Sequence, residues 1–136
     1  MILLDTHVMV WLFDGEPKLG PRTLEAIAAA NAAESLWVSP ISFWELAMLV
    51  GKNRLTLGMS PQAWVRTMLS RSEIRLAEIT PDIAVAAGSL TGLHGDPGDR
   101  IVIATALALG AELATRDRLI LDYARQGPFR TIDARR

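Results

Sequence analysis

Short apolar runs alternate with longer segments of helical character along the chain. The apolar runs end at polar or turn-forming residues, which is typical of strands buried in a sheet. They fall at Met1–Leu4, Leu36–Ser39, Ile74–Ile79, Glu112–Thr115 and Phe129–Ile132. The alternation of strands and helices predicts an α/β fold with a central, mostly parallel five-stranded sheet that is flanked by helices on both faces.

Helix-starting residues precede most of the intervening segments. The helices are expected at Thr6–Phe13, Pro21–Ala33, Phe43–Val50, Ser60–Ser70, Pro81–Leu90, Pro97–Leu109 and Arg118–Arg125. Ser42 is the expected N-cap of the third helix, with Glu45 three residues later as in a capping box. Asp96 before Pro97 is the expected N-cap of the sixth, which puts Asp99 in its first turn.

Composition limits the kinds of site that the chain can build. Its 136 residues suit one domain, 1–136, and half of them are hydrophobic. There is no cysteine, which excludes disulfides, zinc thiolate sites and thiol nucleophiles. With only His7 and His94 available, a bound metal is expected to be a hard cation held by oxygen atoms.

The amino terminus gives no sign of a secretion signal, and no segment is expected to span a membrane. The apolar first residues are interrupted by Asp5 and His7 and lack a basic leader, and no apolar run reaches the length of a membrane span. We therefore expect a cytoplasmic protein. The net charge of -1 argues against avid, non-specific binding to nucleic acid. It does not exclude a nuclease, because bound metals restore positive charge where a phosphate sits.

Four carboxylates are expected to meet at one end of the sheet. Asp5 directly follows the first strand, and Asp117 comes two residues after the fourth. Glu45 and Asp99 are expected in the first turns of helices that follow loops from the same side of the sheet. Ligands of open parallel sheets bind beyond the carboxyl ends of the strands. The sequence therefore predicts a site made of these four acids.

Such a cluster predicts a metal and, through the metal, a reaction. Two carboxylates about 4 Å apart repel by roughly 4 kcal/mol at an effective dielectric constant of 20. The cluster must therefore bind protons or a cation. Oxygen ligands without cysteine favour Mg²⁺ or Mn²⁺, which activate water and bridge to phosphate oxygens. Phosphodiester hydrolysis is the chemistry that this donor set suits.

Each acid also has a purely structural interpretation. Asp5 suits a turn, Glu45 suits the capping box with Ser42, and Asp117 suits the start of the last helix. We assign Asp96 to capping and Asp99 to the metal.

Other polar residues lie close to these acids in the sequence. The hydroxyls of Thr6, Thr115 and Ser42 are candidates to hold a carboxylate or a metal-bound water. His7 is either a proton shuttle or a satisfied polar residue. Two interpretations remain open for the basic residues, contact with phosphates or solvated surface. These residues are Lys52, Arg54, Arg116 and Arg118.

The same segments resemble a known family. LLDTH at 3–7, SFWELA at 42–47, DPGDRIVIATALALG at 96–110 and LATRD at 113–117 are similar, in order and spacing, to PIN-domain proteins. Within that family they are most similar to the VapC toxins of type II toxin–antitoxin systems. The resemblance covers nearly the whole chain and implies a single PIN domain over 1–136.

The resemblance also implies a function. The family's four acids fall on Asp5, Glu45, Asp99 and Asp117, which would bind one or two Mg²⁺ or Mn²⁺ ions and cleave RNA. It further implies a homodimer that a VapB-like antitoxin neutralises, with DNA bound only through the antitoxin. One position departs from the pattern. Gly98 stands where the family often has a bulky apolar residue, and we expect it to loosen the first helical turn.

Other functions remain as hypotheses beside a metal-dependent endoribonuclease toxin. A catalytically inactive PIN-like module that binds RNA or protein is the main alternative. A haloacid-dehalogenase-like phosphatase would need an Asp-x-Asp, which Asp5-Thr6-His7 does not supply. A receiver domain would need a lysine late in the sheet, and the only lysines are Lys18 and Lys52.

Overall fold

Five strands form one sheet at the centre of the computed structural model, which describes residues 1–136. The strands are β1 (Ile2–Leu4), β2 (Leu36–Val38), β3 (Arg75–Leu76), β4 (Glu112–Thr115) and β5 (Arg130–Asp133). They lie in the order β3-β2-β1-β4-β5, and every neighbouring pair is parallel. The chain therefore builds one half of the sheet on each side of β1. The crevice between the carboxyl ends of β1 and β4 is where such a sheet binds ligands.

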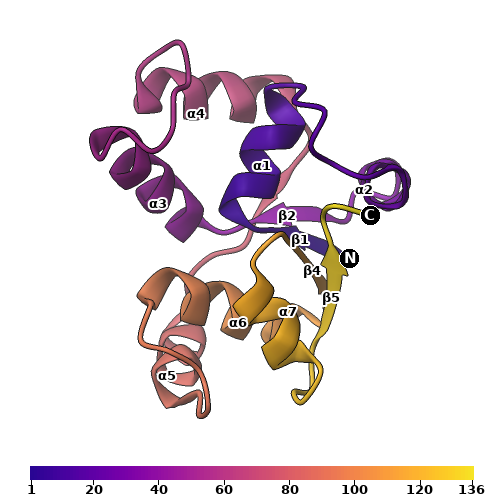
Figure 1. The fold of residues 1–136 in the computed structure, drawn as a ribbon, viewed down its shortest axis with the longest axis vertical. Coiled ribbons are helices and arrows are strands. Elements are labelled where there is room, and N and C mark those ends of the chain that lie inside the picture. The colour runs from indigo at the N-terminus through magenta and orange to yellow at the C-terminus, as the bar shows by residue number, and fades with distance from the viewer.

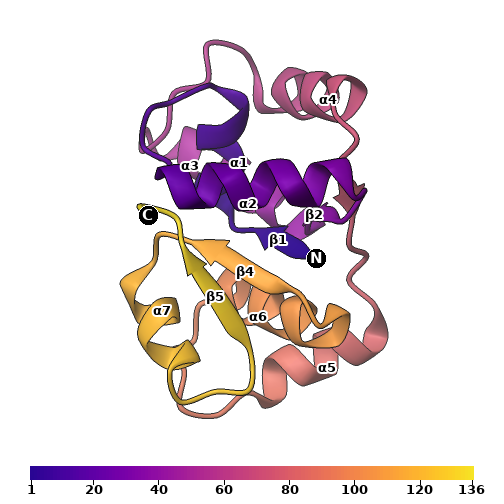
Figure 2. The ribbon, with the colours of Figure 1, turned by 90° about the vertical axis from the view of Figure 1, so that its right-hand side faces the viewer.

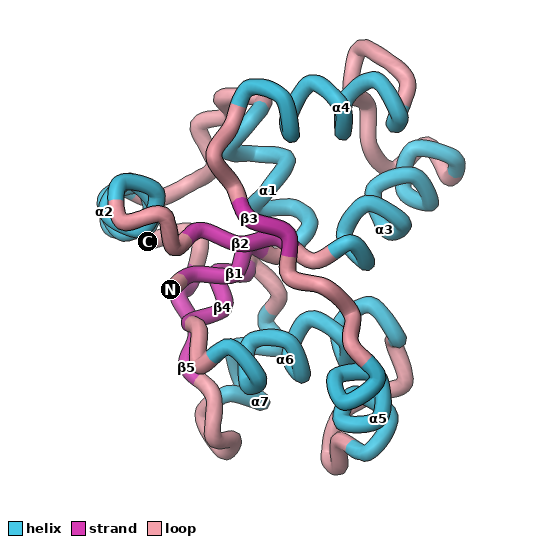
Figure 3. The backbone as a smooth tube through the Cα atoms, turned by 180° about the vertical axis from the view of Figure 1, so that it is seen from behind, coloured by secondary structure: helices cyan, strands magenta, loops and turns pink.

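Helices cover both faces of this sheet. They are α1 (Thr6–Phe13), α2 (Pro21–Ala32), α3 (Pro40–Gly51), α4 (Pro61–Arg71), α5 (Pro81–Ser89), α6 (Pro97–Leu109) and α7 (Arg118–Ala124). Figure 1 shows α1 to α4 on one side of the sheet and α5 to α7 on the other, and the view from behind in Figure 3 agrees. None of these helices combines the length and the apolar character that a bilayer crossing requires.

The alternation of side chains along the strands divides the apolar core in two. Leu4 of β1 points towards α1 to α4 and packs in a cluster with Met9 and Leu46. Leu3 points the other way and packs with Ile103 and Leu113 in the core under α6 and α7. β1 is thus apolar on both faces, which is why it appears in the sequence as a continuous apolar run. The predicted fold class is confirmed, and the sheet is parallel throughout.

The third strand is shorter than the sequence predicts. Only Arg75 and Leu76, within the expected Ile74–Ile79, form the strand, and both are exposed. β3 lies at the edge of the sheet and pairs only with β2. An edge strand has one row of backbone partners and little apolar contact, so the apolar pattern of this segment overstates its strand.

The start of the third helix corrects the capping prediction. Ser39, not Ser42, is the N-cap of α3, and its hydroxyl accepts a hydrogen bond from the Ile41 N–H at 3.2 Å. Pro40 occupies the first helical position, where its missing N–H costs no hydrogen bond. Ser42 is therefore buried inside the first turn, and Glu45 lies in the second turn rather than the first. Glu45 consequently takes no part in a capping box and its carboxylate is free for another role.

Candidate metal centre

The four predicted acids line one cavity at the carboxyl edge of the sheet. The cavity has a volume of about 500 Å³. Its acidic lining residues are Asp5, Glu45, Asp96, Asp99 and Asp117, and its basic ones are His7, Lys52, Arg54, Arg116, Arg118 and Arg135. The structure thus places the four predicted acids together, and Asp96, the expected N-cap and a further candidate for the site, lies among them. An acidic centre with basic walls suits a metal that meets a phosphate.

Asp5 is held in place by hydrogen bonds from two elements. As the N-cap of α1, its Oδ1 accepts a hydrogen bond from the Thr6 N–H at 2.9 Å. Its Oδ2 accepts one from Thr115 Oγ1 at 2.6 Å, and that hydroxyl accepts one from the Asp117 N–H at 3.0 Å. Burial raises the pKa of Asp5, and the two hydrogen bonds oppose that rise. Thr115 therefore fixes Asp5 against β4 and positions the backbone of Asp117.

Two acids open α6. Asp96 is its N-cap, and its Oδ1 accepts hydrogen bonds from the Gly98 N–H at 2.9 Å and the Asp99 N–H at 3.4 Å. Asp96 therefore has the capping role that the sequence predicts. Asp99 is buried in the first turn, and its Oδ2 lies 3.2 Å from His94 Nε2. Burial, reinforced by the charges of Asp5 and Asp96, raises the pKa of Asp99 to about 8.

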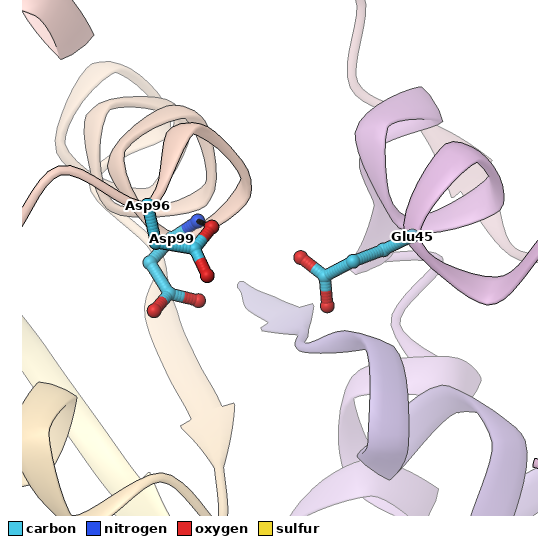
Figure 4. Close-up of side chains that lie close together, drawn as sticks. All are labelled: Glu45, Asp96 and Asp99. Carbon is cyan, nitrogen blue, oxygen red and sulfur yellow. Dashed lines mark hydrogen bonds between the residues drawn. The ribbon is translucent and has the colours of Figure 1, made fainter. Parts of the chain in front are cut away.

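Glu45 reaches across from α3 to the start of α6. Ligand atoms of Glu45, Asp96 and Asp99 all lie within 4.8 Å of one another. Figure 4 shows the carboxylate of Glu45 pointing from one helix towards the two aspartates on the other. Burial raises the pKa of Glu45 to about 7, with a further contribution from Asp5. Asp96 is thus both a helix cap and a member of this carboxylate group.

Gly98 makes the approach of Glu45 possible. A Cβ at position 98 would overlap Glu45 Oε1, so only glycine leaves room for this carboxylate. The expected effect of Gly98 was a looser helical turn. In the structure, its consequence is space for Glu45 beside the N-terminus of α6.

Asp117 lies at the rim of the cavity. It is the N-cap of α7, where its Oδ1 accepts a hydrogen bond from the Leu119 N–H at 2.8 Å. Its charge adds to the rise in pKa of Asp5, Glu45 and Asp99. Its carboxylate does not belong to the group within 4.8 Å.

The remaining polar candidates differ in their surroundings. Thr6 Oγ1 is buried without a hydrogen-bond partner, although it lies close enough to Glu45 to oppose the rise in that carboxyl's pKa. Ser42 Oγ is likewise buried and unpartnered. His7 Nε2 lies 3.2 Å from Arg116, and burial together with that arginine lowers the pKa of His7 to about 4. His7 is therefore neutral near pH 7.

Two residues of the site were missed in the sequence. His94 contacts Asp99, and the only available signal was its position two residues before the N-cap Asp96. Arg135 lines the cavity and donates a hydrogen bond to the Arg116 carbonyl at 2.7 Å. It lies after the last strand, where no pattern in the sequence pointed to the site.

The donor set fits a hard divalent cation. Its ligand atoms are carboxylate oxygens, and three of the acids have raised pKa values because they are buried and repel one another. A cation among them would remove that repulsion. The unpartnered Thr6 hydroxyl adds a further oxygen donor at the same place. The cluster is thus suited to bind a metal ion.

The class of protein follows from the fold, the site and the sequence together. The PIN domain model matches residues 2–126, so the chain belongs to the PIN domain family. The curated "Ribonuclease VapC22" of Mycobacterium tuberculosis is 34% identical over 128 residues, which make up 93% of this chain and 95% of that protein.

Two solved structures share the fold. A chain of VapBC2 from Rickettsia felis, bound to a DNA fragment from its promoter, matches with a TM-score of 0.70 at 20% identity, covering 97% of this chain and 98% of that one. A chain of DNA-bound VapBC from Salmonella typhimurium matches with a TM-score of 0.67 at 17% identity, and 96% of each chain is covered.

Proposed function

We propose that this protein is a metal-dependent endoribonuclease that hydrolyses RNA phosphodiester bonds at the acidic cavity. The observation that carries the proposal is the convergence of Asp5, Glu45, Asp99 and Asp117 on one cavity. Burial and mutual repulsion there raise the pKa values of Asp5, Glu45 and Asp99. Similarity to a ribonuclease over nearly the whole chain supports the same activity. The alternative is a PIN-like module that binds RNA or protein without cutting, and an absence of RNA cleavage would favour it.

The proposed metal is Mg²⁺ or Mn²⁺. Both ions prefer oxygen ligands and keep several waters, so they need only a few carboxylates from the protein. We assign Asp5, Glu45, Asp99 and Asp117 as ligands or as positioning groups for metal-bound water, with Asp96 as a further carboxylate beside Glu45 and Asp99.

In the proposed mechanism, the metal ion and the side chains of the cavity have separate roles. When bound, the metal supplies positive charge for the phosphate and lowers the pKa of water. Asp5 is held rigid by the Thr6 N–H and the Thr115 hydroxyl, and Asp99 by His94. Glu45, on the opposite wall, completes the ligand set or orients the attacking water. The guanidinium of Arg116 stacks over Trp11 at 5.5 Å, and with Arg118 it lines the cavity where a phosphate would bind.

We further propose a VapB-like antitoxin as partner, a homodimer as the assembly, and binding to DNA only through the antitoxin. The support is the family and the shared fold with chains of VapBC complexes. Exposed apolar side chains offer surface for such partners, among them Trp44 on α3, which is 51% exposed, and Met59 before α4, which is 47% exposed. Size-exclusion chromatography of the protein alone and after co-expression with a candidate antitoxin tests both assemblies.

The activity is tested with purified protein, free of antitoxin, on a mixed RNA substrate with Mn²⁺ and then with EDTA. We expect chelator-sensitive cleavage, and Asp99→Asn is expected to lower its rate about 100-fold, because a lost metal ligand costs several kcal/mol of transition-state stabilisation. Asp82→Asn, at an exposed acid in the first turn of α5, is the matched control and is expected to leave the rate unchanged. If no RNA is cleaved, or if Asp99→Asn cleaves as well as the wild type, the proposed activity is wrong.

A further inference from the structure

A second polar cavity lies beside the acidic one, between α7 and β5. It has a volume of about 740 Å³. Figure 2 shows α7 and β5 side by side, with β5 at the edge of the sheet. Four arginines line this cavity, and we call it the arginine groove: Arg118, Arg125, Arg130 and Arg136. Arg118 also lines the acidic cavity, so the two cavities share a wall.

The arginines of the groove have no internal anionic partners. The ion pairs of the structure are Lys18–Glu16, Arg75–Glu34 and His94–Asp99. None involves a groove arginine, although Glu112 and Asp133 also line the groove. All four arginines are exposed. Four unpaired guanidinium groups around one hollow form an anion-binding surface, because each offers a planar fork of N–H donors that matches a phosphate.

The arrangement of the arginines gives the groove a direction. Arg118 begins α7 and Arg136 follows β5, both near the carboxyl edge of the sheet where the acidic cavity lies. Arg125 is the C-cap of α7 and Arg130 begins β5, so they lie towards the opposite edge. β5 has four residues, which corresponds to a length of about 10 Å. A chain of phosphates that passes through the acidic cavity can continue along the groove for that distance.

We propose that the arginine groove binds the phosphodiester backbone of single-stranded RNA on one side of the cleavage site. This inference rests on the proposed function, because it names the path of that enzyme's substrate. The lining favours a polyanion whose charges lie on its backbone: only Leu121, Ala124 and Phe129 are apolar. Protein–protein interfaces are depleted of charged residues at their core, whereas six of the ten residues that line the groove are charged. The groove therefore contributes affinity that does not depend on base sequence.

Binding of a fluorescein-labelled uridine 12-mer, measured by anisotropy in EDTA so that cleavage cannot occur, tests the proposal. The groove variant is Arg125→Gln combined with Arg130→Gln, since neither residue lines the acidic cavity. The matched control is Arg66→Gln combined with Arg71→Gln, two exposed arginines of α4 on the other face of the sheet. Circular dichroism and the thermal midpoint verify that each variant is folded.

The expected magnitude follows from counterion release. Each phosphate contact contributes about 0.7 to the slope of log K against log salt for a single strand, so losing two changes the slope by about 1.4. At about 0.15 M salt this corresponds to a roughly tenfold weaker affinity. The control variant is expected to bind like the wild type. With Mn²⁺, the KM for cleaving the 12-mer rises by a similar factor in the groove variant, whereas cleavage of a dinucleotide reporter is unchanged.

Several results would overturn the proposal. They are equal binding by wild type and groove variant, an equal loss in the control variant, and no wild-type binding even at low salt. A glutamate 12-mer that binds as tightly as the RNA, with the same dependence on Arg125 and Arg130, would assign the groove to an acidic polypeptide instead. If the binding results hold while no RNA is cleaved with Mn²⁺, the groove stands and the proposed nuclease activity fails.

Discussion

Removing the charge of Asp99 should stabilise the metal-free protein. Its pKa is raised from 3.8 to about 8. At pH 7 the Asp99 carboxyl is therefore ionised in the unfolded chain and protonated in the folded one. One pKa unit corresponds to about 1.4 kcal/mol, so the folded state is disfavoured by about 4 kcal/mol in the absence of screening. The cavity opens to solvent, and screening reduces this to about 2 kcal/mol. We expect Asp99→Asn to raise the free energy of unfolding in EDTA by that amount.

The dependence on pH has a definite sign. A carboxyl with a raised folded-state pKa leaves the native state with more bound protons than the unfolded state, so stability falls as pH rises towards the folded-state pKa. His7 acts oppositely between about pH 4 and 6.5, because its folded-state pKa is lowered to about 4. Above pH 7 only the carboxyl effect remains. Asp99 and Glu45 together should lower the stability of the wild type by about 1 kcal/mol between pH 7 and 9.

Urea unfolding monitored by the fluorescence of the four tryptophans measures both effects. In EDTA, the Asn variant should be more stable than the wild type and less dependent on pH. At pH 7, Mn²⁺ should stabilise the wild type much more than the variant, because binding to the folded state adds to stability. Asp82→Asn, far from the cluster, should change stability by less than about 0.5 kcal/mol. If Asp99→Asn destabilises the protein in EDTA, the picture of mutually repelling carboxylates is wrong.

Three further substitutions test the supports of the site. Thr115→Val removes the hydroxyl that holds Asp5; it should cost about 1–2 kcal/mol in urea unfolding and weaken Mn²⁺ binding about tenfold in calorimetry. An unchanged Mn²⁺ affinity would mean that this hydrogen bond does not position Asp5. Gly98→Ala displaces the Glu45 carboxylate; it should weaken Mn²⁺ binding about tenfold, with less than about 1 kcal/mol lost in stability. Wild-type affinity would show that Glu45 need not occupy this position. Arg100→Gln loses hydrogen bonds to four backbone carbonyls between positions 87 and 94 and should cost about 2–3 kcal/mol. If the free energy of unfolding in urea falls by less than about 0.5 kcal/mol, the guanidinium of Arg100 does not hold the segment 87–94 in place.

The fold could be predicted because its signals are local and strong. Each buried strand has continuous apolar residues, and Pro21, Pro61, Pro81 and Pro97 mark helix starts at positions that the structure confirms. The same rule applies to Pro40. Pro40 was not predicted as a helix start because Ser42 and Glu45 also fit a capping box, which the backbone does not form.

The site could be predicted only as far as topology determines it. Residues that follow parallel strands lie at the carboxyl edge of the sheet, so the closeness of Asp5 and Asp117 could be predicted without any distance. The closeness of Asp96 to Glu45 depends on how α3 and α6 approach each other and on the missing side chain of Gly98. Those are properties of tertiary packing, and no spacing along the chain encodes them.

The acids of the cavity have unequal tolerance to change, because three of them begin helices. Asp5, Asp96 and Asp117 accept backbone N–H groups at the starts of α1, α6 and α7, whereas Glu45 and Asp99 cap nothing. At Asp5, Asp96 or Asp117, a replacement that cannot accept a hydrogen bond would remove the carboxylate from the cavity and also destabilise the start of a helix. Loss of either other acid relieves repulsion. Substitutions that abolish the activity should therefore be tolerated best at Glu45 and Asp99. At the other three acids the tolerated replacements should be Asn or Ser, which still accept the capping hydrogen bond.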